Sequence, residues 1–298
     1  MSLAGSPGQR PPLRRLRALV EARYAGHGRG IEEAAASTPQ THPDGHSRLR
    51  LLSYNIQAGI PATRFRDYLT GGWQHVLPSR RRLDNLDQIA RLLLRFDLVG
   101  LQEVDGGSLR SGFVNQAEYL AQRGGFAHWH LQLNRDLGHF GQHSNALLSR
   151  VRPTRVTEHR LPGLIPGRGV LQARFGDDDD ALTLLIVHLA LGRRARRQQL
   201  RFIAGLVRDR RHVVVMGDMN SRLRHWRDLD PLRDAELHSP AQDLPTFPSW
   251  QPQRCIDHIL VGPTLRVEKV ETLNCLHSDH LPVGVELRLP PQVRLASG

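Results

Sequence analysis

Short runs of apolar residues alternate with polar segments along most of the chain, and their length is typical of buried β-strands. These runs predict strands at residues 48–56, 98–104, 144–150, 169–175, 181–191, 212–218, 255–261 and 281–289. Three other segments repeat apolar residues at helical spacing, which predicts amphipathic helices at residues 79–97, 113–125 and 194–210. We expect Ser79 to cap the first helix, and Gly124 and Gly125 to end the second.

The predicted strands outnumber the predicted helices, and several strands follow one another with no helix between them. This order predicts an α/β (α+β) fold in which two mixed β-sheets pack together with helices on the outside. The acidic run at residues 177–180 lies between two predicted strands, so we expect it to form a solvated hairpin turn.

The N-terminal segment has a different composition from the rest of the chain. Residues 1–48 are rich in Gly, Pro, Ala, Ser and Arg, and "ASTPQTHPDGHS" is typical of a loop. We predict a partly disordered appendage at 1–48, a folded domain at 49–289 and a tail at 290–298. A short basic helix within residues 13–24 would dock on the folded domain, stay disordered or lie on a membrane; its short apolar face favours the first two.

The amino-acid composition limits the classes of protein to which this chain can belong. Hydrophobic residues make up 39% of the 298 residues, which is compatible with a sizeable core. No stretch approaches the roughly 18 apolar residues of a membrane span, and the N-terminus lacks the apolar core of a secretory signal. We therefore expect a cytoplasmic protein, taken to be a monomer, with Cys255 and Cys275 as free thiols.

The net charge is +12, and Lys269 is the only lysine among 41 basic residues. A basic surface attracts phosphate-bearing partners such as nucleic acid or anionic lipid headgroups, including peripheral contact with a membrane. A GC-rich genome would also produce an excess of arginine over lysine. The two explanations remain open, as does the role of the basic face of the helix at 194–210.

Polar side chains follow the apolar runs at the points where the predicted strands end. They are Asn55, Glu103, His188, Asp218 with Asn220, and Asp279 with His280. In layered α/β folds the strand ends and their loops form the ligand crevice. Residues two apart on an extended segment point to the same face, so we expect Asp218 and Asn220 to converge.

Asp257 lies within the apolar run "RCIDHILVG", so we expect its carboxylate to be buried and to need a partner. A histidine would be suitable, and His280 and His188 are the two candidates. Together these residues supply oxygen ligands and proton-transfer groups. Such oxygen ligands suit Mg²⁺ or Mn²⁺ rather than zinc.

The motifs, in this order, resemble those of the endonuclease/exonuclease/phosphatase family, which includes pancreatic-type deoxyribonucleases, abasic-site endonucleases, neutral sphingomyelinases and inositol-phosphate phosphatases. The matching stretches are "LLSYNIQAG", "LVGLQEVD", "SNALLSR", "IVHLALGRRARRQQL", "VVVMGDMNS", "TFPSWQPQRCIDHILV" and "HSDHLPV". They span about residues 49–289, which makes 49–289 the expected catalytic domain. The resemblance implies a four-layer α/β/β/α sandwich and metal-dependent hydrolysis of a phosphoester.

The resemblance also implies roles for individual residues. The metal, Mg²⁺ with Mn²⁺ as a possible substitute, would be bound by Asn55, Glu103 and Asp279. The expected catalytic residues are His188, Asp218, Asn220, Asp257 and His280, with Asp218 acting on the attacking water and Asp257 holding His280. Asn145 and Arg168 are the expected substrate contacts. The number of metal ions stays open.

The chain departs from the abasic-site endonucleases, because Gln57 follows the first asparagine motif and His188 stands where a tyrosine-containing motif is usual. These differences resemble the lipid-phosphodiesterase and phosphatase branches and small bacterial members. Nucleic acid, a phospholipid headgroup and a small soluble phosphoester remain alternative substrates. A non-catalytic phosphate- or nucleic-acid-binding module on the same fold is the alternative function, because a fold does not dictate activity.

Overall fold

The computed structural model describes residues 47–60, 80–136, 141–163, 166–176, 178–222, 232, 235–241 and 243–295. The predicted helix within residues 13–24, the remainder of the appendage up to residue 46 and the predicted cap Ser79 lie outside these residues.

Two β-sheets form the centre of the molecule. The six-stranded sheet has the order β10-β11-β1-β2-β4-β3, with strands Arg266–Thr272, Val283–Arg288, Arg48–Asn55, Leu98–Val104, Gln142–Ser149 and His128–Asp136. The five-stranded sheet has the order β5-β6-β7-β8-β9, with strands Arg155–Arg160, Gly169–Phe175, Leu182–His188, His212–Asp218 and Asp257–Val261. Each sheet mixes parallel and antiparallel pairs, as predicted.

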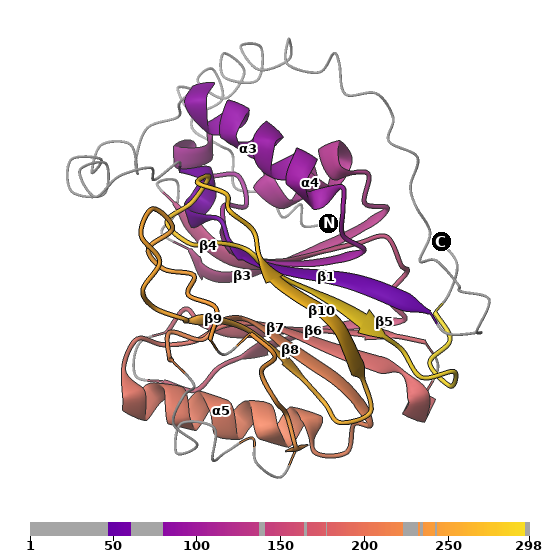
Figure 1. The fold of residues 1–298 in the computed structure, drawn as a ribbon. Coiled ribbons are helices and arrows are strands. Elements are labelled where there is room, and N and C mark those ends of the chain that lie inside the picture. The colour runs from indigo at the N-terminus through magenta and orange to yellow at the C-terminus, as the bar shows by residue number, and fades with distance from the viewer. Residues whose placement is uncertain are drawn as a thin grey trace, which may run out of the picture.

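Helices cover the outer face of each sheet (Figure 1). Helices α3 (Arg80–Leu93) and α4 (Gln116–Gly124) pack on the six-stranded sheet, and α5 (Arg193–Val207) packs on the five-stranded sheet. Short 3-10 helices occur at Gln57–Gly59, Leu109–Ser111 and Asp178–Asp180. A central apolar cluster, which includes Leu51, Ile186 and Met216, fills the space between the sheets. The four-layer α/β/β/α sandwich is therefore confirmed.

Local sequence signals explain how several elements begin and end. The side chain of Asn115 accepts hydrogen bonds from the backbone N–H groups of the first turn of α4, and Gly125 ends this helix with φ 64°. The described part of the acidic run, residues 178–180, lies between the antiparallel strands β6 and β7, where Phe175 pairs with Leu182. The predicted hairpin turn is thus confirmed, and the two cysteines are buried thiols outside any disulfide.

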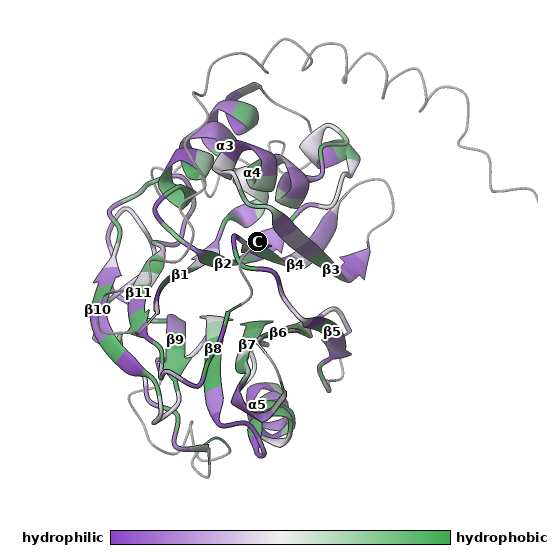
Figure 2. Cartoon of the chain, turned by 90° about the vertical axis from the view of Figure 1, so that its right-hand side faces the viewer, coloured by the Kyte–Doolittle hydropathy of each residue, from purple (hydrophilic) through white to green (hydrophobic). Residues whose placement is uncertain are grey.

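The sequence pattern missed three strands, β3, β5 and β10, all at sheet edges. An edge strand is paired on one side only and borders solvent, so it needs no continuous apolar run. β5 and the end of β3 are accordingly hydrophilic (Figure 2). The unpredicted β3 matters below because it contributes side chains to a cavity.

The topology brings strand ends from both sheets to the same end of the sandwich. β1 runs parallel to β2, and β7 runs parallel to β8, so the carboxyl ends of each pair lie together. β9 and β11 are antiparallel to these strands and therefore begin at the end where β8 and β1 finish. Among the described residues, no helix combines the length and apolar character that crossing a bilayer requires.

Candidate active site

Glu103 is presented by an irregularity near the end of β2. The pairing of β2 with β4 shifts register between Leu101 and Val104, and Glu103 has φ 55°. A bulge re-aims a side chain that regular alternation would direct elsewhere, and a positive φ is costly for a residue other than glycine. Glu103 is thus directed to the end of the sandwich where the other polar residues gather.

The buried carboxylate of Asp105 anchors the loop between β2 and α4, which follows Glu103. Asp105 accepts hydrogen bonds from the N–H groups of Gly107 and Ser108, from the Ser108 and Ser111 hydroxyls, and from Arg110 Nε at 2.8 Å. Burial by itself would raise the pKa of Asp105, but the Ser108 hydrogen bonds and the Arg110 charge outweigh it and lower this pKa. The ionised Asp105 carboxylate therefore holds the β2–α4 loop in place.

His188 and Asp218 are adjacent because they end the parallel strands β7 and β8 in register. His188 Nε2 lies 3.4 Å from Asp218 Oδ2 and 3.9 Å from Glu103 Oε1. Asn55 Nδ2 donates to Asp218 Oδ2 at 3.3 Å. Burial, together with the positive charge of Arg168, holds the pKa of His188 well below its usual range, so the ring is neutral at pH 7.

Gly217 allows the close approach of these two strands. Its φ is 148°, and a Cβ at this position would lie 1.8 Å from the carbonyl oxygen of Val187. Any side chain here would therefore force β7 and β8 apart next to His188 and Asp218. Gly217 thereby keeps the His188 imidazole next to the Asp218 carboxylate.

Asp257 and His280 form a buried pair. His280 Nδ1 lies 2.8 Å from one carboxylate oxygen of Asp257 and 3.1 Å from the other, and the Thr246 hydroxyl donates to Oδ2 at 2.6 Å. Burial lowers the pKa of His280, but the Asp257 carboxylate more than compensates and raises it to about 10. Of the two candidate histidines, the structure places His280 against Asp257.

Burial and mutual repulsion disfavour the ionised form of carboxylates at this end of the sandwich. Burial, with the nearby charges of Asp257 and Glu103, raises the pKa of Asp218 to about 7. The pKa of Asp279 is also raised, first by burial and then by the charge of Glu103. Such a set of hard oxygen donors fits a divalent cation, which would relieve this repulsion.

Two groups of residues could hold that cation. Asp218, Asp257 and His280 offer ligand atoms within 4.8 Å of one another. However, the oxygens of Asp257 already accept from His280 Nδ1 and Thr246, and His280 is protonated, so neither is a suitable ligand. The predicted set of Asn55, Glu103 and Asp279 fits better. Among the described residues, Asn55 Oδ1 accepts only the N–H of Gln57, at 3.1 Å, which leaves one lone pair available.

The argument that Asp218 and Asn220 share one face of a strand is wrong. Strand β8 ends at Asp218, and Asn220 has φ 49°. A tight turn joins the two residues instead, because the N–H of Asn220 donates to Asp218 Oδ1 at 2.9 Å. The Asn220 carboxamide donates to the carbonyl of Leu189 at 3.0 Å and so ties the turn to the end of β7.

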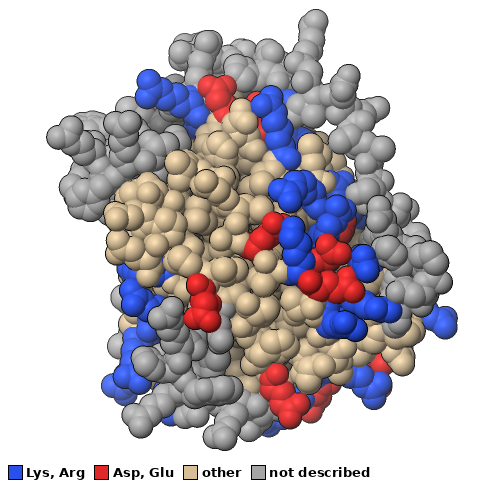
Figure 3. Space-filling model, in the orientation of Figure 1, with Lys and Arg blue, Asp and Glu red and all other residues tan. Residues whose placement is uncertain are grey.

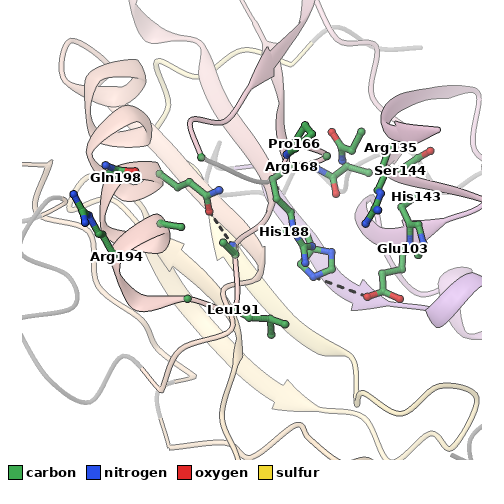
Figure 4. Close-up of a pocket in the computed structure, with 18 residues that line it drawn as sticks. Glu103, Arg135, His143, Ser144, Pro166, Arg168, His188, Leu191, Arg194 and Gln198 are labelled. Atoms are coloured by element: carbon green, nitrogen blue, oxygen red, sulfur yellow. Dashed lines mark hydrogen bonds and ion pairs between the residues drawn. The ribbon is translucent and has the colours of Figure 1, made fainter. Parts of the chain in front are cut away.

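Asn145 and Arg168 line a cavity of about 770 Å³ that also includes Glu103 and His188 (Figure 4). Asn145 is fully buried, and its Nδ2 donates to the carbonyl of Gly169 at 3.1 Å. Its Oδ1 has no hydrogen-bond partner among the described residues. The two expected substrate contacts thus lie at a pocket next to the charged cluster.

Sequence reasoning missed three contributors to this region. Thr246 completes the surroundings of Asp257, while His143 and Arg135 line the cavity. Thr246 lies in a segment without regular structure, and Arg135 lies on the unpredicted strand β3. Only His143, two positions before Asn145 on β4, carried a signal that could have been used: the alternation of a strand places both on one face.

Several solved structures share the fold of this chain at low sequence identity. An endonuclease/exonuclease/phosphatase family protein from Bacteroides thetaiotaomicron is 20% identical, with TM-score 0.63 over 82% of this chain and 99% of that chain. A mannosyl-6-phosphatase from the same species is 19% identical, with TM-score 0.61, covering 80% and 99%. D. rerio TDP2 complexed with a single-strand DNA product is 18% identical, with TM-score 0.55, covering 80% and 98%.

None of the curated protein sequences compared with the chain matches it. The profile of the Endonuclease/Exonuclease/phosphatase family matches residues 52–280, from β1 to His280, and so includes all the strands except β11 and the whole polar cluster. Members of this family are usually hydrolases that act on phosphoester bonds. The chain therefore belongs to the endonuclease/exonuclease/phosphatase family.

Proposed function

We propose that this protein is a divalent-metal-dependent hydrolase of phosphoesters, phosphodiesters among them. One observation carries the proposal: Glu103, His188, Asp218 and the Asp257–His280 pair lie together where strands of both sheets end. A phosphoryl-transfer site requires a cation-binding group, a base for water and donors for the phosphate, and these residues offer all three.

Asn55, Glu103 and Asp279 would hold Mg²⁺, or Mn²⁺ in its place. When bound, the cation would polarise a non-bridging phosphate oxygen and offset the negative charge of the carboxylates. The raised pKa values of Asp218 and Asp279 support this assignment, because burial and the neighbouring carboxylates disfavour their charge more than protonated His280 favours it.

Asp218 would take the proton of the attacking water. A pKa of about 7 is near the value at which a general base combines adequate ionisation with adequate basicity. Asn55 Nδ2 orients this carboxylate, and Asn220 holds the turn that follows it. Asn220 thus acts as a positioning residue in this proposal.

The two histidines would have different roles because their charges differ. His280 is protonated at neutral pH and its Nε2 lies 3.9 Å from Asp218, so it would neutralise charge that develops on the phosphate. His188 is neutral and would donate one hydrogen bond from Nε2. Asp257 would fix the tautomer and the charge of His280.

The cavity beside the site favours a small phosphoester over a duplex. Its volume of about 770 Å³ is in the range of small-molecule sites, and a mannosyl-6-phosphatase is among the structures of similar fold. On the face over β1 and β10, the described basic side chains lie among acidic ones, form pairs such as Arg48–Glu268 at 2.8 Å and make no continuous basic track (Figure 3). Single-stranded nucleic acid remains the second candidate, supported by the net charge of +12 and by the DNA product bound to D. rerio TDP2.

The test is hydrolysis of bis-p-nitrophenyl phosphate by purified wild type and Asp218→Asn, each with Mg²⁺, Mn²⁺ or EDTA. We expect metal-dependent turnover in the wild type and a loss of at least about 100-fold in the variant, the lower end of the contribution of a general base. Glu158→Gln, which alters an exposed carboxylate on β5, serves as the matched control. Turnover that resists EDTA, or full activity of Asp218→Asn, would exclude this mechanism. Metal binding without turnover on any phosphoester would favour the non-catalytic module.

A further inference from the structure

The cavity extends well beyond the groups that hydrolysis needs. It shares Glu103 and His188 with the candidate active site, but Asp218, Asp257 and His280 do not line it. Most of its wall comes from β3, β4, the loop before β6, and the β7–α5 connection (Figure 4). A substrate whose scissile phosphate contacts Glu103 and His188 would therefore place its remaining part in this cavity.

The cavity is basic. Arg135, Arg168 and Arg194 line it, whereas Glu103, at the edge of the active site, is the only acidic residue among the lining residues. No hydrogen bond or ion pair within the described part of the chain involves the guanidinium of any of these three arginines. Positive charges that face a cavity and form no direct ion pair with a described carboxylate can form a site for an anion.

Two more deeply buried arginines of the structure bind protein groups instead. Arg110 binds the Asp105 carboxylate at 2.8 Å. Arg150 donates to four backbone carbonyls, at distances between 2.8 Å for Gly125 and 3.2 Å for Leu94. These guanidinium groups are satisfied by the protein itself, whereas the partly buried Arg168 at the cavity has no such partner among the described residues.

A close backbone approach holds Arg135 and Arg168 next to each other. Gly167 has φ 105°, and a Cβ there would lie 2.9 Å from Cβ and 3.2 Å from Cδ of Arg135. The loop that carries Arg168 therefore packs directly on the aliphatic part of Arg135. Arg168 is itself partly buried, and desolvation lowers the pKa of its guanidinium, which makes a bound anion more favourable.

The opposite wall carries Arg194 but is otherwise mainly apolar, which suits an uncharged molecular body. Leu191 leads into α5 with 75% of its surface exposed, and Ala190 and Ala195 extend this apolar wall. Figure 4 places Leu191 and Gln198 across the cavity from Arg135 and His143. A compact ligand with a polar or apolar ring between two anionic groups would contact both walls.

We propose that this cavity binds the body of a small phosphoester that carries a second phosphate, with Arg135 and Arg168 as the ligands of that second phosphate. The assignment rests on the proposed function in one respect, namely that the scissile phosphate lies at Glu103 and His188. The required chemistry is a bisphosphate on a compact scaffold, and sugar bisphosphates and nucleoside bisphosphates are its two sources.

Calorimetric dissociation constants test the proposal in the Asp218→Asn protein with Mg²⁺, where hydrolysis does not consume the probes. The probe pairs are fructose 6-phosphate with fructose 1,6-bisphosphate, and thymidine 5′-monophosphate with thymidine 3′,5′-bisphosphate. In at least one pair we expect the bisphosphate to bind about tenfold or more tightly, the effect of one hydrogen bond to a charged group. The pair that shows this preference identifies the source.

Arg135→Gln, added to the Asp218→Asn protein, should reduce the preference for the bisphosphate to less than about threefold. The substitution keeps the aliphatic stem that packs on Gly167 and removes the charge. Arg201→Gln is the matched control: it removes the same charge from an exposed position of α5 that does not line the cavity. We expect the control to retain the preference. Equal binding within both probe pairs, or equal effects of the two substitutions, would overturn the subsite.

Two further measurements separate this proposal from its alternatives. Tighter binding of a ten-residue oligothymidylate than of either bisphosphate would show that the cavity is part of a nucleic-acid track, which also overturns the proposal. Bis-p-nitrophenyl phosphate hydrolysis by the wild type reports on the proposed function alone. Turnover without a bisphosphate preference would refute only the subsite, whereas the preference without turnover would refute only the hydrolase.

Discussion

The Asp257–His280 pair gives a stability prediction that can be worked out from the structure. Both side chains are buried, and the carboxylate raises the pKa of His280 to about 10, compared with about 6.5 in the unfolded chain. A group whose pKa is higher in the folded than in the unfolded state stabilises the fold when it is protonated. For His280, the full contribution is present below about pH 6.5. This contribution decreases as the pH rises and is lost at about pH 10.

Asp257→Asn keeps the shape of the side chain and removes its charge. At pH 7, the three pH units below a pKa of about 10 correspond to about 4 kcal/mol, at 1.36 kcal/mol for each unit. Asp218 would regain part of this free energy, because Asp257 also raises its pKa. We therefore expect the variant to lose about 2–4 kcal/mol of unfolding free energy at pH 7, and little near pH 10.

Urea unfolding with EDTA between pH 6 and 9.5 measures this loss, and NMR titration of the His280 ring measures its pKa directly. Glu158→Gln is the control, because its partner His130 lies at the same distance of 2.8 Å but the two side chains are 39% and 47% exposed. Solvent screening should limit its effect to less than about 1 kcal/mol. An unchanged His280 pKa, or a loss in Asp257→Asn that does not depend on pH, would refute the reasoning.

Three other substitutions test separate parts of the site. Mg²⁺ should raise the melting temperature of the wild type by preferential binding to the folded state, and Glu103→Gln should remove most of the rise; equal rises would exclude Glu103 as a ligand. Gly217→Ala should cost about 3 kcal/mol or more in urea unfolding, because its Cβ would lie 1.8 Å from the Val187 oxygen; wild-type stability would contradict this close approach. Asp105→Asn should cost about 2–4 kcal/mol, because it leaves the buried Arg110 without its carboxylate. Since the pKa of Asp105 is lowered, this contribution is present above about pH 3.8 and is lost on further acidification, so the two acid-unfolding curves should converge at low pH.

The sequence was most informative about strands buried in the sheets. The predicted bounds 98–104, 169–175 and 212–218 agree with β2, β6 and β8. Strands buried on both faces need apolar side chains at nearly every position, so a simple run identifies them. Because the residues of the candidate active site follow such strands, their approximate location could be predicted as well.

The details of the site depend on backbone geometry that residue patterns do not encode. Glu103 reaches the site through a register shift, and Asn220 follows a turn, so regular strand alternation fails at both. The cavity depends on Arg135, which lies on an edge strand without an apolar run. Thr246 meets Asp257 only because an irregular segment folds back against β9. These contacts arise from tertiary packing, so local patterns could not identify them.

The central claim is that the polar end of the sandwich is organised around a divalent cation. Anomalous scattering from a crystal grown with Mn²⁺ would locate that ion directly. We predict a peak about 2.0–2.3 Å from a carboxylate oxygen of Glu103, near Asn55 and Asp279. A peak coordinated by Asp257 and His280, or no peak at this end of the sandwich at saturating Mn²⁺, would contradict the account.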